Sequence, residues 1–185
     1  MKKHPTSRSA ASFVAGGCLA ALFLAGAAQA ITETSFKYST PQTGFLNIPP
    51  TAWVSKVSDN AYGHPNNVLR VSTNDENCFA APVYLPEGAV MSEYAAWYSN
   101  DGGTLSLALF RRANSDAGAG EQIATKGLQG TSFGVTAVAK KSLSGDTAKV
   151  DNQHYSYWME YCATNSVNAW LMNVRVTYTY NNAGD

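Results

Sequence analysis

The sequence predicts an all-β protein, a single antiparallel β-sandwich of about eight to ten short strands, for which a jelly roll is one arrangement. In most segments hydrophobic and polar residues alternate, as they do in a strand with one buried face. Clusters of Gly, Pro, Asn, Asp and Ser separate these segments at intervals of about ten residues. Apolar stripes at helical spacing are missing.

The first thirty residues precede this domain and have the three parts of a secretion signal. Lys2, Lys3 and Arg8 are followed by a long apolar run, which ends at the small residues around Ala28-Gln29-Ala30. We expect cleavage near Ala30, so that one domain over residues 31–185 works in a periplasm or outside the cell. The alternative is an uncleaved anchor, because the apolar run is long for a signal peptide.

The charge of the remaining chain argues against two classes of partner. The whole sequence has 13 basic and 13 acidic residues, and removing residues 1–30 takes away three basic ones, leaving a net charge of −3. Nucleic acid binding needs a basic surface that displaces counterions from phosphates, and no basic run is present. No second apolar stretch approaches the length of a membrane span. We therefore expect neither a nucleic acid partner nor membrane attachment after cleavage.

The first half of the domain contains six segments with strand character. They are SFKYST and GFLNI near the mature N-terminus, NVLRVST (67–73), CFAAPVYL (78–85), AVMSEYAAWYS (89–99) and TLSLALFRR (104–112). Pro49-Pro50 ends the second of them, and Pro82 predicts an edge position or a bulge because proline has no N–H to donate. The stretch Asn100-Asp101-Gly102-Gly103 favours a hairpin turn.

The second half continues the pattern. Strands are expected in QIATKG (122–127), SFGVTAVAKK (132–141), QHYSYWMEYC (153–162) and residues 170–180, and LSGDTAKVD (143–151) indicates a turn with a short strand. In the last strand Trp170, Val174, Val176 and Tyr178 share one face with alternating polar residues on the other. The turn-forming stretch ATNSVNA before it suggests a hairpin loop.

Two cysteines remain once Cys18 is removed with the signal. In an oxidising compartment Cys78 and Cys162 are expected to form a disulfide near a rim of the sandwich, tying an early hairpin to the last one. Closing so long a loop stabilises a fold by roughly 4–5 kcal/mol in the chain-entropy view. The alternative is two buried free thiols. For a metal, only His64 and His154 could assist these cysteines, so we expect neither a metal nor another cofactor.

Aromatic residues are numerous, and Trp158 is the one for which alternation predicts exposure. It lies opposite the face that holds Tyr155, Tyr157 and Tyr161, so it points outward if these tyrosines fill the core. An exposed indole is suited to stacking on a sugar ring. Cys162 has the same parity as Trp158, and disulfides are usually buried, so either one assignment is inverted or a bulge intervenes.

One motif points to catalysis. Gly130-Thr131-Ser132-Phe133-Gly134 matches G-x-S-x-G, in which the serine of α/β-hydrolases occupies a strand-to-helix turn. Asp146 or Asp151 and His154 follow in the expected order. However, a strand-like run follows this serine where a helix is needed, and no βα units precede it. We therefore assign no catalytic residue and keep a secreted serine hydrolase using Ser132 as the alternative function.

Two regions resemble a group of short exported bacterial β-sandwich proteins of unassigned function. The first is Val83-Tyr84-Leu85-Pro86-Glu87-Gly88-Ala89 with the later LSLALFRR, and the second is VDNQHYSYWMEY followed by WLMNVRVTYTY. The resemblance covers most of residues 45–180. It consists of strands and turns, so it implies the fold and transfers no functional residue.

The sequence thus favours a secreted, non-catalytic binding or structural module. Its expected ligand is a surface glycan, an envelope component or another protein. An inhibitor or a toxin-like effector is a third reading, since small disulfide-linked β domains also serve in those roles. The sequence leaves the oligomeric state open.

Overall fold

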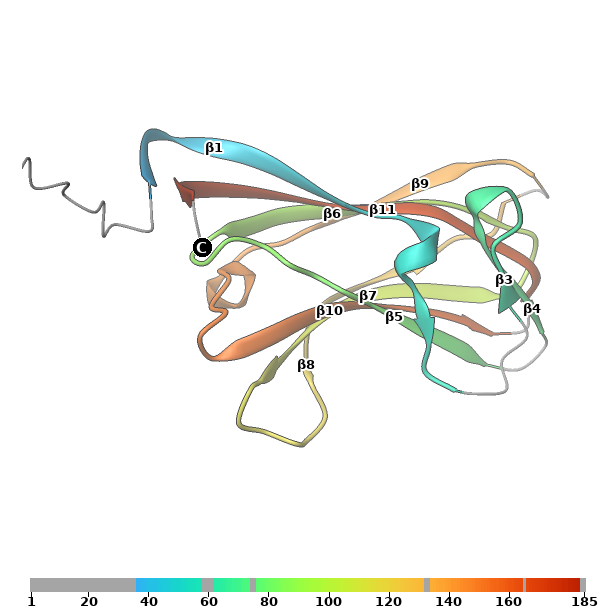
Figure 1. The fold of residues 1–185 in the computed structure, drawn as a ribbon. Coiled ribbons are helices and arrows are strands. Elements are labelled where there is room, and N and C mark those ends of the chain that lie inside the picture. Colours follow the sequence, from blue (N-terminus) through green and yellow to red (C-terminus); the bar gives the residue numbers. More distant parts are fainter. Residues whose placement is uncertain (1–35, 58–61, 74–75, 132–133, 165, 184–185) are drawn as a thin grey trace, which may run out of the picture. The chain divides into compact units, whose positions relative to one another are not determined.

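A computed structural model describes residues 36–57, 62–73, 76–131, 134–164 and 166–183 (Figure 1). The predicted signal over residues 1–30 lies outside this part of the chain. The elements are β1 (Phe36–Ile48), η1 (Pro50–Ala52), β2 (Val54–Ser55), β3 (Tyr62–Gly63), η2 (Pro65–Asn67), β4 (Leu69–Thr73), β5 (Asn77–Pro82), β6 (Val90–Asn100), β7 (Thr104–Ala113), β8 (Glu121–Leu128), β9 (Ala137–Ser142), η3 (Asp146–Ala148), β10 (Tyr155–Thr164) and β11 (Ser166–Ala183). Among these residues no helix has the length and hydropathy to cross a bilayer.

The strands form two antiparallel sheets, which confirms the predicted fold class (Figure 1). The six-stranded sheet has the order β3-β4-β11-β6-β9, and the five-stranded sheet has the order β2-β5-β10-β7-β8. Strand β11 is 18 residues long, so its free side accommodates β4 along its first part and β1 along its second. The described residues contain eleven strands, more than expected, because β2 and β3, with two residues each, are too short to show a periodic pattern in the sequence.

The inner faces of both sheets contribute to one hydrophobic core. Alternate residues of the central strands point inward, and the largest fully buried side chains include Tyr94, Phe79, Met159, Tyr161 and Leu171. The hydroxyl of Tyr94 on β6 donates a hydrogen bond of 2.9 Å to the carbonyl of Leu107 on β7. Because β6 and β7 belong to different sheets, this buried bond joins the two layers.

Both predicted hairpins are instead crossings between the sheets. Asn100–Gly103 connects β6 of the six-stranded sheet to β7 of the five-stranded one. Strand β10, which ends at Thr164, and strand β11, which begins at Ser166, also belong to different sheets. Turn-forming residues specify that the chain reverses, but they do not specify which strand it will pair with. From β4 onward consecutive strands therefore alternate between sheets, except for the true hairpin β7–β8.

Two local expectations also change. SFKYST and GFLNI belong to one strand, β1, whose pairing with β11 is irregular between Lys37 and Gln42. The short strand expected within residues 143–151 is replaced by η3, after which Lys149 forms only an isolated bridge with Val90. Ala148 and Val150 are buried, the Gly88 N–H donates to the Val150 carbonyl, and the Val150 N–H donates to the Ala89 carbonyl. Apolar packing and these two backbone hydrogen bonds therefore hold the segment in place of a longer ladder.

Pro82 lies at an open sheet edge, as predicted. Strand β2 covers β5 only at Phe79 and Ala80, and the next N–H, that of Val83, donates to Tyr157 on the opposite side. The nitrogen of Pro82 therefore faces the uncovered edge, where no donor is needed.

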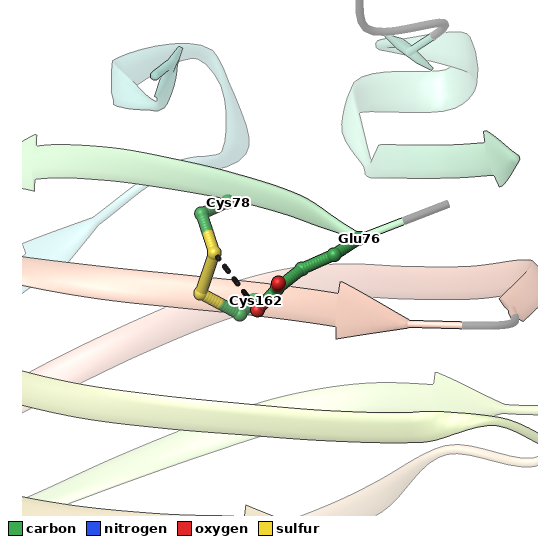
Figure 2. A group of neighbouring side chains, drawn as sticks. All are labelled: Glu76, Cys78 and Cys162. Carbon is green, nitrogen blue, oxygen red and sulfur yellow. Dashed lines mark hydrogen bonds between the residues drawn. A yellow bond between two sulfur atoms is a disulfide. The ribbon is translucent and has the colours of Figure 1, made fainter. Parts of the chain in front are cut away.

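The predicted disulfide is present, and its position is a correction. Cys78 on β5 and Cys162 on β10 lie directly opposite each other within one sheet, with their Cα atoms 4.1 Å apart (Figure 2). The bond therefore joins neighbouring strands and does not tie two hairpins together. Both cysteines and Trp158 lie on the outer face of the sheet and are partly buried. Trp158 and Cys162 therefore share the outer face, and their positions require neither an inverted face assignment nor a bulge in β10.

Candidate functional site

Trp158 points outward from the five-stranded sheet, between two hydrophobic neighbours. The register places Pro82 of β5 on one side of it and Phe110 of β7 on the other. The Trp158 and Phe110 rings are stacked, with centroids 5.3 Å apart and planes 8° from parallel. Tyr157 and Met159, its neighbours in the chain, point inward and are buried. Alternation therefore predicted the direction of this side chain correctly.

A glycine explains why the indole is only partly exposed. Gly120 ends the loop between β7 and β8 and lies so close that a Cβ at this position would overlap the Trp158 ring. The same Cβ would also lie 3.0 Å from the carbonyl oxygen of Arg111. The absence of a side chain thus lets the loop close over one edge of the indole and restrict its movement. This contact was not predicted from the sequence.

A cavity of about 490 Å³ opens beside Trp158, a volume typical of ligand sites. Its walls come from the end of β5 with the residues after it, the start of β10 and two loops. The lining residues are Ala80, Ala81, Pro82, Val83, Tyr84, Asn114, Asn152, Tyr155, Ser156, Tyr157 and Trp158. Tyr84 is 80% exposed, the largest exposure among the large hydrophobic side chains described. Sequence reasoning missed Tyr84, although it has the same outward parity as Pro82.

The polar residues of the cavity are held by hydrogen bonds. Ser156 Oγ donates to Asn114 Oδ1 at 2.6 Å, and Asn114 Nδ2 lies 3.4 Å from the carbonyl oxygens of Asn152 and Gln153. Asn152 Nδ2 donates to the carbonyl of Leu85 at 2.9 Å. Two amides and a hydroxyl are therefore fixed next to the aromatic rings, and each retains hydrogen-bonding capacity for a ligand.

The titratable groups near the cavity stabilise the loop before β10. His154 Nδ1 lies 2.9 Å from both carboxylate oxygens of Asp151, and this hydrogen bond lowers the pKa of Asp151. Burial raises the pKa of Tyr157, whose hydroxyl accepts a hydrogen bond from the Asp151 N–H. Among the described residues, no serine, threonine or cysteine side chain has a hydrogen bond to His154. The pair therefore lacks a nucleophile in this part of the chain.

The hydrolase alternative stays a hypothesis, because Ser132 lies outside the described residues. Its neighbour Thr131 accepts a hydrogen bond from the N–H of Asn100, close to the start of β7. His154 lies near the other end of β7, where its carbonyl accepts a hydrogen bond from the N–H of Asn114. Ten residues of strand span about 30 Å, so Thr131 and the Asp151–His154 pair lie at opposite ends of the sheet. Strand β9 follows the motif, where a nucleophile elbow needs a helix.

Among the described residues, one group of side chains resembles a metal site, and it consists of Glu76 and the two disulfide-bonded cysteines. Glu76 Oε1 lies 3.9 Å from Cys78 Sγ, and the two sulfur atoms complete the group (Figure 2). Metal-binding cysteines act as thiolates, and these sulfurs are bonded to each other. His64 lies elsewhere, where its Nε2 is 2.9 Å from the carbonyl oxygen of Pro50.

Comparison with known proteins identifies similar folds only. No protein-family description matches the chain, and no curated protein matches it in sequence. A solved structure of a xylan-binding module, CBM15, aligns with a TM-score of 0.50 at 10% identity, over 74% of this chain and 97% of that module. The C-terminal CBM6 of LamC, a marine laminarinase from Zobellia galactanivorans, aligns with a TM-score of 0.47 at 11% identity, over 72% and 99%.

The similarity to the xylan-binding module confirms the β-sandwich. The resemblance noted in the sequence pointed to proteins of unassigned function, whereas this similar solved structure is named as a carbohydrate-binding module. At such low identity the similarity extends to the fold alone.

Proposed function

We propose that the domain is a secreted, non-catalytic module that binds a neutral polysaccharide in the cavity beside Trp158. One observation carries the proposal: an indole, an exposed tyrosine and hydrogen-bonded amides line the same cavity. A sugar ring has apolar faces and a rim of hydroxyl groups, so it requires flat hydrophobic surfaces and fixed polar groups together. The similarity in fold to a xylan-binding module makes xylan the first ligand to test.

Each part of the cavity has a role in this proposal. Trp158 uses one face against Phe110, and the rest of the indole contributes to the cavity wall. Tyr84 provides a second ring at the cavity mouth. Asn114, Asn152 and Ser156 are oriented before a ligand arrives, which lowers the entropy lost on binding.

Affinity electrophoresis through gels containing xylan or a β-glucan tests the proposal. We expect the mature protein to be retarded in at least one neutral polysaccharide, and Tyr84→Ala and Trp158→Ala to lose at least about tenfold in affinity, or about 1.4 kcal/mol. Val54→Ala is a matched control, because Val54 is exposed on the same sheet and lies outside the cavity.

Two results would count against this function. One is equal retardation of the wild type and both aromatic variants, and the other is no binding to any neutral polysaccharide in a broad panel. Tyr84→Ala keeps the test valid if Trp158→Ala fails to fold, because Tyr84 contributes little buried surface.

A further inference from the structure

The outer face of the six-stranded sheet carries a row of hydrophobic side chains and one arginine that the cavity does not use. It consists of Phe45 on β1, Arg175 on β11, Trp97 on β6 and Val138 on β9, and we call it the sheet row. These strands are neighbours in the order β1, β11, β6 and β9, so the row extends across about three strand spacings, or about 14 Å. Phe45 and Val138 are 56% and 49% exposed. The row is therefore a long, open surface with accessible hydrophobic groups.

Arg175 occupies the centre of the sheet row and is oriented by aromatic rings. Its guanidinium carbon lies 5.1 Å from the centroid of Phe45 and 5.2 Å from that of Trp97, within the range of cation–π attraction. Its Nε is buried without a hydrogen-bond partner. None of the ion pairs found among the described residues includes Arg175. Two aromatic rings therefore orient the Arg175 guanidinium, and no carboxylate among the described residues forms an ion pair with it.

The charges around the sheet row are predominantly positive. Arg70 and Lys140 lie on the same face, as their register with Trp170 and Ala95 shows. On strands β4, β6, β9 and β11 the only acidic residue is Glu93, and its Oε1 lies 3.3 Å from Lys140 Nζ. Three cations against one carboxylate give this face a local charge opposite in sign to that of the domain. Such a surface favours an anionic ligand at short range.

Uncharged polar side chains complete the surface. Asn47 and Asn173 flank the row, with Asn173 Nδ2 lying 3.4 Å from Asn47 Oδ1, and Thr177 is paired with Phe45 across the strands. Amides and hydroxyls beside rings are suited to the hydroxyl groups of a sugar chain, whereas an apolar protein partner would leave them unpaired.

We propose that the sheet row is a second binding site, specific for an acidic polysaccharide. A uronate carboxylate pairs with the Arg175 guanidinium, and the adjoining sugar rings lie on Phe45 and Trp97. Arginine is suited to this role because its planar fork can donate two parallel hydrogen bonds to one carboxylate. The site is separate from the cavity beside Trp158, which lies on the other sheet, so either proposal can fail alone.

Calorimetric titration with galacturonate oligomers tests the site, with the fully methyl-esterified oligomers as the matched neutral ligand. We expect binding of the acidic form only, weakened as salt is raised. Arg175→Gln and Phe45→Ala should each reduce affinity at least tenfold. Arg175→Lys should recover only part of the affinity, because it restores the charge without the planar group. Trp158→Ala is the control variant and should bind the acidic oligomers as the wild type does.

Several results would overturn the proposal. They are equal binding of the acidic and esterified oligomers, no binding of either, or acidic binding that survives in Arg175→Gln. Loss of acidic binding in Trp158→Ala would also overturn it, because that would assign the ligand to the cavity. Circular dichroism checks that each variant is folded. Phe45→Ala removes an exposed ring, so it keeps the test valid if an Arg175 variant misfolds.

Discussion

Removing the disulfide should cost this domain a large part of its stability. Cys78 and Cys162 are separated by 84 positions, and cross-linking a loop of that length removes enough entropy from the unfolded chain to contribute about 4.5 kcal/mol. Domains of this size are stable by only about 5–15 kcal/mol. The bridge also joins directly paired residues of β5 and β10, so the native register is maintained without it by the remaining ladder.

The test is guanidinium unfolding of Cys78→Ala/Cys162→Ala beside the oxidised wild type. We expect the double variant to lose about 3–5 kcal/mol while keeping a β-sheet spectrum. Wild-type protein with its disulfide reduced is the matched control, because it also lacks the bridge but retains both sulfurs. If the effect comes from the unfolded chain, both forms should lose similar amounts.

The reasoning would be refuted by a folded double variant that loses less than about 1 kcal/mol. A large loss in the double variant with almost none in the reduced wild type would also refute it. That outcome would mean that packing of the sulfur atoms, and not loop closure, stabilises the fold.

Three further predictions concern the packing. Gly120→Ala should destabilise the domain by about 1–3 kcal/mol and weaken polysaccharide binding, because the added Cβ would overlap the Trp158 ring. Gly118→Ala is the control, since a Cβ at that position would meet only the Asp116 side chain. Equal melting temperatures of the two variants would contradict the contact between Gly120 and Trp158. Tyr94→Phe should cost about 1 kcal/mol in urea unfolding through loss of its hydrogen bond to Leu107, and an unchanged midpoint would argue against that bond. Burial raises the pKa of Tyr94 and Tyr161, so above about pH 10 the unfolded chain releases protons that the folded state keeps. Stability should therefore fall as pH rises, with a shallower slope in Tyr94→Phe, and a flat profile to pH 11.5 would contradict the burial of these hydroxyls.

Most strands and their inward faces could be predicted because a period of two is a local property of the chain. Residues 153–162 illustrate this, since the alternation that buries Tyr157 and Tyr161 also places Trp158 outside. The exception is β11, where the irregular pairing between Leu171 and Asn173 buries Leu171 and places Trp170 on the outer face, opposite the expected partner Val174. The disulfide could be predicted from chemistry alone, because only two of the three cysteines lie outside the predicted signal. The pairing of strands could not be predicted, since Asn100–Gly103 forms the same tight reversal whether the chain stays in one sheet or crosses to the other.

The candidate site was only partly accessible to sequence reasoning. Trp158 was found by parity, but Tyr84, Asn114 and Asn152 come from separate segments that only the fold brings together. The cover that Gly120 provides depends on a close approach between a loop and a ring, which has no periodic signal. For the same reason Phe45, Trp97 and Arg175 look unrelated in the sequence, although they are neighbours across three strands.

The most direct test of the binding proposal uses the four tryptophans as reporters in a proton–nitrogen NMR titration with a neutral xylan or β-glucan oligomer. Trp53 is buried, Trp97 and Trp170 lie on β6 and β11 of the other sheet, and Trp158 lines the cavity, so each indole N–H reports on a known region. We predict that the Trp158 signal shifts with saturation while the Trp53, Trp97 and Trp170 signals stay in place. Saturable shifts at another indole with Trp158 unmoved, or no shift at any of the four, would contradict the account.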